Sequence, residues 1–263
     1  MEGFIVFLFG VITASLPFLL IGLVFILVFA GVLFFGITLA KKMIKEKNET
    51  IEYCKKNGLS FEDTMMAGFP KECKNFKITK KGKQRDFYYV VSGIRDNVYF
   101  SVMNYKYSDN EPPRESTFLG MKVISRTGNR RHQKPDYYAT LCFLSVDGLN
   151  MPHFFIRDES FIMDSLGKVF GGQDINFNDD PEFSKMFVLQ GDNESEIRRF
   201  FNSKIRSSFV KFHQKGFVYE GVGKHLFVYT PNNYSKIEEK MRFFADSIKF
   251  VPALIPSDNE TLL

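Results

Sequence analysis

The first part of the chain carries no charged side chain over a long distance. From Gly3 to Ala40, 38 consecutive residues are uncharged and most of them are apolar. A helix needs about 20 such residues to cross the hydrocarbon core of a bilayer, and there it satisfies its own backbone hydrogen bonds. We therefore expect residues 1–40 to form a membrane anchor with one transmembrane helix.

Pro17 divides this apolar stretch, because a proline has no N–H and favours a helix start or a kink. The run from Pro17 to Ala40 is long enough for one span, whereas Phe4–Ala14 is short for a second. The first piece therefore lies in the outer interface, extends one kinked helix, or forms a hairpin with the second piece. A cleaved signal peptide is the alternative, but it needs a basic start and a short apolar core, and this chain has neither.

Four lysines follow the apolar stretch directly: Lys41, Lys42, Lys45 and Lys47. The only charged side chain before the stretch is Glu2. Positive charge stays on the cytoplasmic side of a membrane. A single span places the N-terminus outside and the remainder inside, and a hairpin places both ends inside. Either topology predicts a protein of the cell membrane whose folded part faces the cytoplasm. Lys41 and Lys42 are also candidates for contact with lipid headgroups.

After the anchor, the spacing of apolar residues predicts a juxtamembrane helix over residues 41–58, which Asn57-Gly58 would end. Ser60, with an acidic residue at Asp63, predicts the N-cap of a short helix that reaches about Ala67. We expect residues 59–255 to be one soluble domain and residues 256–263 to be a loose tail.

Within this domain, alternation of apolar and polar positions predicts strands in hairpins. The expected hairpins are Phe87–Gly93 with Val98–Tyr107, Ser116–Ser125 with Tyr137–Val146, and Gly216–Glu220 with His225–Tyr229. Two further strands are expected at His153–Arg157 and Met186–Gln190.

Helical spacing predicts one helix over Asn193–Phe212, capped by Asn193 or Ser195, and another over Tyr234–Ile248. A helical turn or two is expected within Asp158–Phe170. Strands and long helices do not alternate, which argues against a doubly wound fold. The predicted fold class is α+β: an N-terminal transmembrane helix, then a soluble domain built on antiparallel β-hairpins with several helices.

Composition adds little to this picture. Charged residues make up 25% and hydrophobic residues 44% of the chain, as in folded proteins. The net charge of +5 is modest, and a nucleic-acid binder usually has a denser basic face, so no nucleic acid is expected as a partner. Three cysteines without a C-x-x-C pair fit a reducing compartment rather than a disulfide framework.

One polar loop resembles a calcium-binding loop, because oxygen-bearing side chains occupy alternate positions. Position six is Asp179 rather than glycine, however, and position twelve is Lys185 rather than glutamate. A polar turn that joins a strand to a helix is the competing interpretation. The candidate metal ligands are Asp174, Asn176, Asn178 and Asp180.

The densest basic loop runs from Arg126 to Lys134 at an expected hairpin tip. It is either a solvated loop or a surface that touches anionic lipid heads. The candidate lipid contacts in it are Arg126, Arg130 and Arg131.

No phosphate loop, zinc-protease helix or serine-hydrolase elbow occurs in the sequence. The four histidines, which are isolated along the chain, are expected to be surface or structural residues: His132, His153, His213 and His225. A thiol catalyst would require a cysteine and a histidine that only the fold could bring together. No catalytic residue, cofactor or small-molecule ligand is therefore predicted.

Several segments resemble the C-terminal part of an uncharacterised family of bacterial membrane-anchored proteins, a domain of unknown function. These segments are Phe170–Phe177 (FGGQDINF), Pro181–Lys185 (PEFSK), Leu189–Asp192 and Glu196–Phe201, followed by Val218–Gly221. Tyr88–Tyr107 is similar to the same family. The resemblance covers most of the soluble part. It implies an anchored domain without an assigned activity and adds no catalytic residue.

The sequence is compatible with three functions. The first is a membrane-tethered cytoplasmic interaction or scaffold domain, with the lipid bilayer as its partner. The second is a hydrolase-like, membrane-anchored enzyme whose site is assembled from distant residues. The third is an accessory subunit whose N-terminal helix contacts another membrane protein. A pocket with convergent titratable groups would favour the enzyme.

Overall fold

The computed structural model describes residues 2–64, 76–110, 114–118, 121–125, 134–159 and 174–255. The chain divides into two compact units, Met1–Glu49 and Thr50–Leu263. Three predicted segments lie outside the described residues: the basic loop up to residue 133, the tail at 256–263, and the helical turns expected within Asp158–Phe170. Of the last segment, only Asp158 and Glu159 are described.

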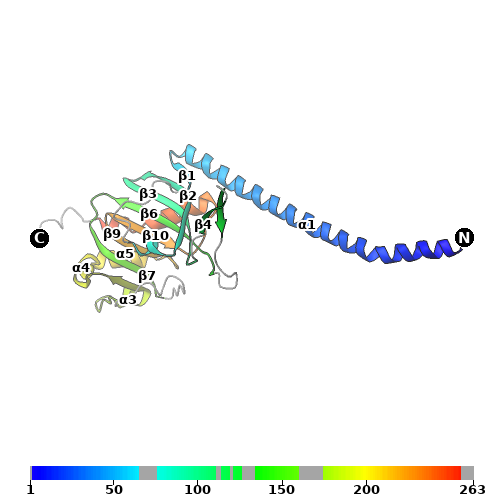
Figure 1. Ribbon diagram of the computed structural model, residues 1–263. Coiled ribbons are helices and arrows are strands. Elements are labelled where there is room, and N and C mark those ends of the chain that lie inside the picture. The colour runs from blue at the N-terminus through cyan, green and yellow to red at the C-terminus, as the bar shows by residue number, and fades with distance from the viewer. Residues whose placement is uncertain are drawn as a thin grey trace. The chain divides into compact units, whose positions relative to one another are not determined.

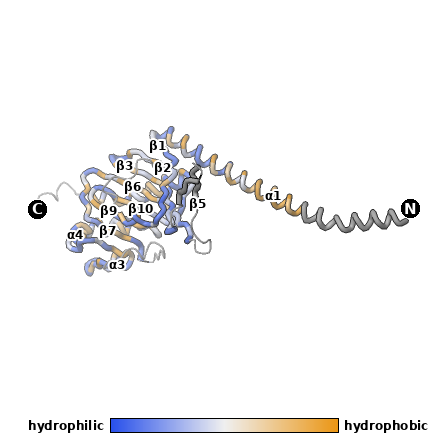
Figure 2. Tube along the Cα trace, in the orientation of Figure 1, coloured by the Kyte–Doolittle hydropathy of each residue, from blue (hydrophilic) through white to orange (hydrophobic). Residues whose placement is uncertain are grey.

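The first unit is formed by helix α1 (Glu2–Lys56), whose last residues, from Thr50 on, belong to the second unit. The helix is continuous through Pro17, so the hairpin alternative is wrong and one long helix is what the sequence forms. Within the described residues, α1 is the one helix that is long and apolar enough to cross a membrane, judged by length and composition. Its apolar side chains from Leu23 to Leu39 are exposed to the surroundings, and Figure 2 shows this stretch as hydrophobic.

The second unit is built on an eight-stranded antiparallel sheet in the order β1-β2-β3-β6-β10-β9-β7-β8 (Figure 1). The strands of this sheet are β1 (Ser60–Thr64), β2 (Gln84–Arg95), β3 (Val98–Ser108), β6 (Tyr137–Val146), β7 (Met151–Asp158), β8 (Phe187–Gly191), β9 (Val218–Gly223) and β10 (His225–Thr230). The helices are α2 (Lys77–Lys80), α3 (Pro181–Met186), α4 (Glu194–Phe200), α5 (Ser203–Lys211), α6 (Ile237–Ile248) and α7 (Val251–Leu254). The predicted α+β class is confirmed.

Two of the expected hairpins are confirmed. β2 pairs with β3 in antiparallel register, and the turn between them places Asp96 and Asn97 at positive φ. Two consecutive residues in this conformation are typical of the tight hairpin turn whose twist matches the strands. β9 and β10 form the other confirmed hairpin, and the strands expected near His153 and Met186 are present as β7 and β8.

The remaining expected hairpin is wrong. β4 (Arg114–Phe118) and β5 (Met121–Ser125) pair with each other in a separate two-stranded sheet. β6 instead lies between β3 and β10. Its side chains from Ala139 to Leu144 are buried on both faces of the sheet, which suits a central strand with a partner on each edge.

The short helix expected after Ser60 is also wrong, because this segment forms the edge strand β1. Ser60 lies opposite Ser92 of β2, and the two hydroxyl oxygens are 2.8 Å apart. The backbone N–H and C=O groups of this segment form their hydrogen bonds with β2, whereas in a helix they would have bonded within the segment. Gly58, at a φ of 65°, ends α1 as expected and lets the chain turn into β1.

The predicted helix over 193–212 is two helices, α4 and α5, with a break at Phe201 and Asn202. The Asn202 side chain accepts a hydrogen bond from the backbone N–H of Ile205 at 3.1 Å and so caps a new helix. Asn193 caps α4, as predicted. The helix at Tyr234–Ile248 is confirmed and begins at Ile237.

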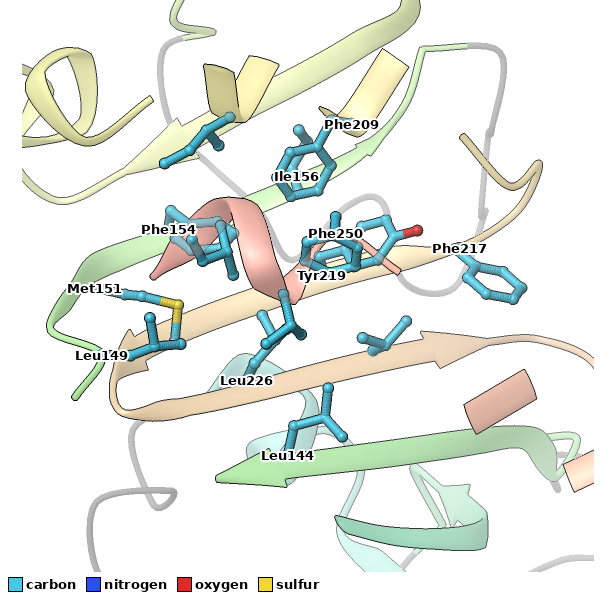
Figure 3. Packing of buried hydrophobic residues seen from close by; sticks show 14 of the residues in the cluster. Leu144, Leu149, Met151, Phe154, Ile156, Phe209, Phe217, Tyr219, Leu226 and Phe250 are labelled. Carbon is cyan, nitrogen blue, oxygen red and sulfur yellow. The ribbon is translucent and has the colours of Figure 1, made fainter. Parts of the chain in front are cut away.

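Hydrophobic side chains cover both faces of the sheet. One cluster gathers residues of the sheet with residues of α3 to α7, and Figure 3 shows part of it around Phe154, Tyr219 and Phe250. The second cluster lies on the opposite face, where Phe76 and Ile78 cover residues such as Phe227. Alternation along each strand sends neighbouring residues to opposite faces, so both faces have to be covered. The many phenylalanines fill these two layers.

Candidate functional site

A group of interacting titratable side chains lies around Glu220 in β9. Its cross-strand neighbours are Phe227 and Phe155, and its side chain is fully buried. The carboxylate accepts hydrogen bonds from the backbone N–H groups of Lys77 at 2.7 Å and Ile78 at 3.4 Å. A buried carboxylate needs such donors, because burial without them costs several kcal/mol.

These two N–H groups belong to the start of α2, where a helix has no backbone partner for them. The N-cap residue Phe76 offers no side-chain oxygen, so Glu220 supplies the acceptor from a strand about 140 residues away in sequence. At the other end of α2, the Tyr105 hydroxyl donates to the carbonyl oxygen of Lys81 at 2.7 Å. The ring of Phe76 packs edge-on against Phe227 with a centroid distance of 4.8 Å. Side chains of the sheet therefore hold α2 at both ends.

His153 in β7 joins this group. Its Nε2 lies 3.2 Å from a carboxylate oxygen of Glu220, and its Nδ1 lies 2.6 Å from Asp192. The hydrogen bond to Glu220 raises the pKa of His153, Asp192 raises it further, and burial acts in the opposite direction. The charged imidazolium can donate one hydrogen bond to each carboxylate. His153 thus links β7, β9 and the turn that follows β8.

Because both ring nitrogens bind carboxylates, His153 has no nitrogen left to activate a nucleophile in this arrangement. A catalytic histidine needs one nitrogen facing the reacting group and the other facing its orienting partner. The geometry of the Glu220 group is that of a clamp on α2. The sequence singled out His153 but missed Glu220 and Asp192; the one available signal was an acidic residue within the apolar strand Val218–Gly223.

The loop proposed for a cation has other contacts in the structure. The Asp174 side chain accepts from the backbone N–H of Leu189 at 3.0 Å. The Asp180 side chain caps α3 and lies 2.9 Å from Nε of Arg206, whose Nη2 is 2.6 Å from Asp179. The buried guanidinium thus occupies carboxylates that a cation would use. Asn176 and Asn178 are exposed. Within the part of the chain that the structure describes, no group of three metal-binding side chains is suitably placed.

Of the candidate lipid contacts, the structure describes Lys41 and Lys42. Lys41 and Lys42 are exposed on α1. Arg126, Arg130 and Arg131 lie outside the described residues.

The other histidines and cysteines that the structure describes are held in structural roles. His213 lies 2.7 Å from Asp158, and His225 is buried with its ring stacked on Phe143. Cys54 and Cys142 are buried free thiols, and burial raises the pKa of each. Thiols with a raised pKa are poor nucleophiles. His132 and Cys73 lie outside the described residues.

A buried amine is the second feature that the sequence did not reveal. Lys240 of α6 is 1% exposed, and burial lowers its pKa to about 7. Its Nζ donates to the carbonyl oxygen of Tyr89 at 2.7 Å, where a bulge in β2 places Tyr89 at positive φ. The signal in the sequence was a lysine three residues after Ile237, on the apolar face of the helix. Cys54, at the end of α1, is its electrostatic neighbour.

Among solved structures, the chain is similar to the crystal structure of the mycobacterial trehalose monomycolate transport factor A, TtfA. The TM-score is 0.45 and the sequence identity is 12%, over 80% of this chain and 97% of the other. A similarity of this size carries no argument about function. No protein-family model matches the chain, and no curated protein matches it.

Proposed function

We propose that the protein is membrane-anchored and that its folded unit is a non-enzymatic interaction domain, a scaffold or accessory module at the cytoplasmic face. The observation that carries this proposal is α1, whose long uncharged stretch has exposed apolar side chains and ends in lysines. Apolar side chains on an isolated helix are stable in lipid and unstable in water. The lysines orient the helix with the folded unit inside.

The side chains that would serve chemistry support a non-enzymatic domain. His153 binds two carboxylates, Arg206 binds two more, and Lys240 is buried against a backbone carbonyl. Each of these groups is engaged with the protein itself, whereas a catalytic group must reach the substrate. Anchoring serves an interaction domain directly, because confinement to a surface raises its effective concentration toward partners there.

An accessory role through α1 has one supporting observation. A Cβ atom built at Gly31 or Gly36 would meet no other atom within 4 Å. Small residues on a membrane helix let a second helix approach closely. In this version of the proposal, α1 contacts another membrane protein as well as lipid.

The test is fractionation followed by protease protection. We expect the full-length protein to stay with the membrane pellet after alkaline carbonate washing. A protease added outside intact cells should leave Thr50–Leu263 uncut, and permeabilised cells should lose it. Recovery of the protein in the soluble fraction contradicts the anchor. Digestion in intact cells contradicts the orientation. Turnover of ester or phosphoester probes by the purified protein contradicts the non-enzymatic assignment.

A further inference from the structure

One end of the large sheet carries an excess of positive charge. Between Lys77 and Arg85, five of nine residues are basic and none is acidic. Lys80, Lys83 and Arg85 are exposed, whereas Lys81 is only partly exposed. Basic residues so closely spaced repel one another, so their grouping requires either solvent or an anionic partner.

The alternation of β2 separates these bases from Asp86, whereas Asp109, which follows β3, is an electrostatic neighbour of Lys81. Phe87 stacks on Tyr105 on the α2 side of the sheet, and Arg85, two residues before it, donates to the carbonyl oxygen of Thr79 on that same side. Asp86 therefore points to the opposite face. There it lies across from Lys106, which also binds Asp136 at 2.8 Å. Arg85 therefore lies on the α2 side of the sheet and Asp86 on the other.

The fold adds a basic residue that is distant in sequence. The side chain of Asn110 binds the backbone of Lys134 through two hydrogen bonds of 2.8 Å. Gln84 donates to the carbonyl oxygen of Asn110 at 3.2 Å, and the backbone N–H of Lys83 donates to Ser108 at 2.9 Å. These bonds hold the backbone of the exposed Lys134 beside Asn110, whose carbonyl oxygen binds Gln84, the residue next to Lys83. We call Lys80, Lys83, Arg85 and Lys134 the basic corner.

We infer that the basic corner binds the surface of an anionic bilayer. The inference rests on the proposed membrane anchor and adds the surface and the lipid chemistry. Thr50 lies ten positions after Ala40, and even a fully extended chain of that length spans at most about 35 Å. The covalent link thus keeps the folded unit within reach of the headgroups. Lysines, as mobile hydrated point charges, suit a diffuse layer of phosphates better than a single bidentate ligand.

The experiment uses the absence of tryptophan from the native chain. Tyr137→Trp places one fluorophore beside the basic corner, where Tyr137 stacks on Tyr107 at 5.1 Å. The full-length protein is reconstituted into bilayers that contain a headgroup spin-labelled lipid. One set is purely zwitterionic phosphatidylcholine and the other includes phosphatidylglycerol. We expect stronger quenching of the tryptophan in the anionic bilayers, and loss of this difference at high salt, which screens the attraction.

Three variants make the test specific. Charge removal in Lys80→Gln, Lys83→Gln and Arg85→Gln together should abolish the difference. A contribution of about 1 kcal/mol per basic residue corresponds to about a 100-fold weaker association for three. Lys80→Arg with Lys83→Arg should keep the difference. The matched control removes three exposed lysines elsewhere on the folded unit, with Lys204→Gln, Lys211→Gln and Lys215→Gln, and should also keep it.

The outcomes separate the two proposals. A protein that fails to insert into the bilayers contradicts the anchor. An inserted protein that is quenched equally in both lipids contradicts the inference alone. Equal effects of the basic-corner and control variants contradict it too, because net charge would then suffice. The inference is supported if the basic-corner variant is no longer quenched more strongly in anionic bilayers while its thermal stability is unchanged. Quenching that requires an added acidic protein overturns the assignment to lipid.

Discussion

At the scale of single residues, the folded unit buries several groups that ordinarily stay in water. Glu220 receives two backbone N–H groups and the His153 ring, so its negative charge has three donors. Lys240 has weaker compensation, which consists of the carbonyl oxygen of Tyr89 at 2.7 Å, the ring of that same tyrosine and the electrostatic effect of Cys54. The same cost of burial therefore has different results. Glu220 ties α2 to the sheet, whereas Lys240 loses much of its basicity.

The role of Glu220 gives the first prediction. In Glu220→Gln, the amide group cannot accept from all three donors, and at least one buried N–H loses its partner. Breaking a buried charged pair in this way costs about 3 kcal/mol of unfolding free energy. Urea denaturation of the purified protein measures the loss. Glu238→Gln, an exposed change on α6, is the control and should have almost no effect. Equal stability of the two variants would contradict the clamp.

Lys240 gives a prediction about pH. Its folded pKa is about 7 and the unperturbed value is 10.5, so between these pH values the unfolded chain binds the additional proton. The free energy of unfolding therefore rises between pH 7 and pH 10.5 because of Lys240. Below pH 7 the amine is charged in the folded protein, and the full cost of burying that charge lowers the free energy of unfolding. Lys240→Met removes the cost and stabilises the protein at pH 7 by on the order of 4 kcal/mol.

Denaturation curves at a series of pH values check this prediction. Lys240→Met should flatten the rise in stability above pH 7, whereas the exposed Lys236→Met should leave it as in the native protein. The prediction fails if Lys240→Met lowers stability at neutral pH, because the amine would then contribute more through its bond to Tyr89 than it costs.

At the scale of helices and strands, the sequence pattern was reliable where partners are adjacent along the chain. The alternation from Phe87 to Tyr107 predicted a hairpin correctly. A tight turn at Asp96 and Asn97 brings the second strand directly alongside the first, so the two strands pair with each other. The pattern failed where the partner is distant. β6 pairs with β10, about 85 residues further on, and no local signal carries that choice.

The same limit explains the candidate site. His153 was visible in the sequence, but its partners Asp192 and Glu220 lie 39 and 67 residues away. Local signals also competed with one another. Ser60 fits a helix cap as well as an edge strand, and the pairing with β2 decided for the strand. The continuous helical period across 193–212 concealed Asn202, which can cap a new helix as readily as it can sit inside one.

The break at Asn202 gives a prediction at this scale. Asn202→Ala removes the acceptor for the N–H of Ile205 and should cost about 1 kcal/mol of unfolding free energy. Asn202→Gly should cost only a few tenths, since glycine also tolerates the cap position. Thermal or urea unfolding distinguishes the two. Ser207→Ala, at an exposed position within α5, is the control and should not destabilise. If Asn202→Ala matches Ser207→Ala, then the cap contributes nothing.

At the scale of the whole molecule, the two units deal with hydrophobic side chains in opposite ways. The folded unit buries its phenylalanines against a sheet that is covered on both faces. A single helix has no second layer against which to bury such side chains, and those from Leu23 to Leu39 are exposed. Water would penalise this exposure, whereas lipid removes the penalty without any further protein. This difference is why the proposed function places α1 in a bilayer.

The anchor can be tested without disturbing the folded unit. Val28→Lys with Phe29→Lys places two charges near the middle of the uncharged stretch. Each costs about 3 kcal/mol on insertion of a helix, so about 6 kcal/mol should move the protein out of the carbonate-resistant membrane fraction. Val28→Ala with Phe29→Ala is the control and should stay in the membrane, because alanine keeps the stretch uncharged. Since both positions lie in the first unit, the double-lysine protein should keep the unfolding transition of the native folded unit. A double-lysine protein that stays membrane-bound would mean that something other than α1 holds the chain there, and the basic corner would be the first surface to remove next.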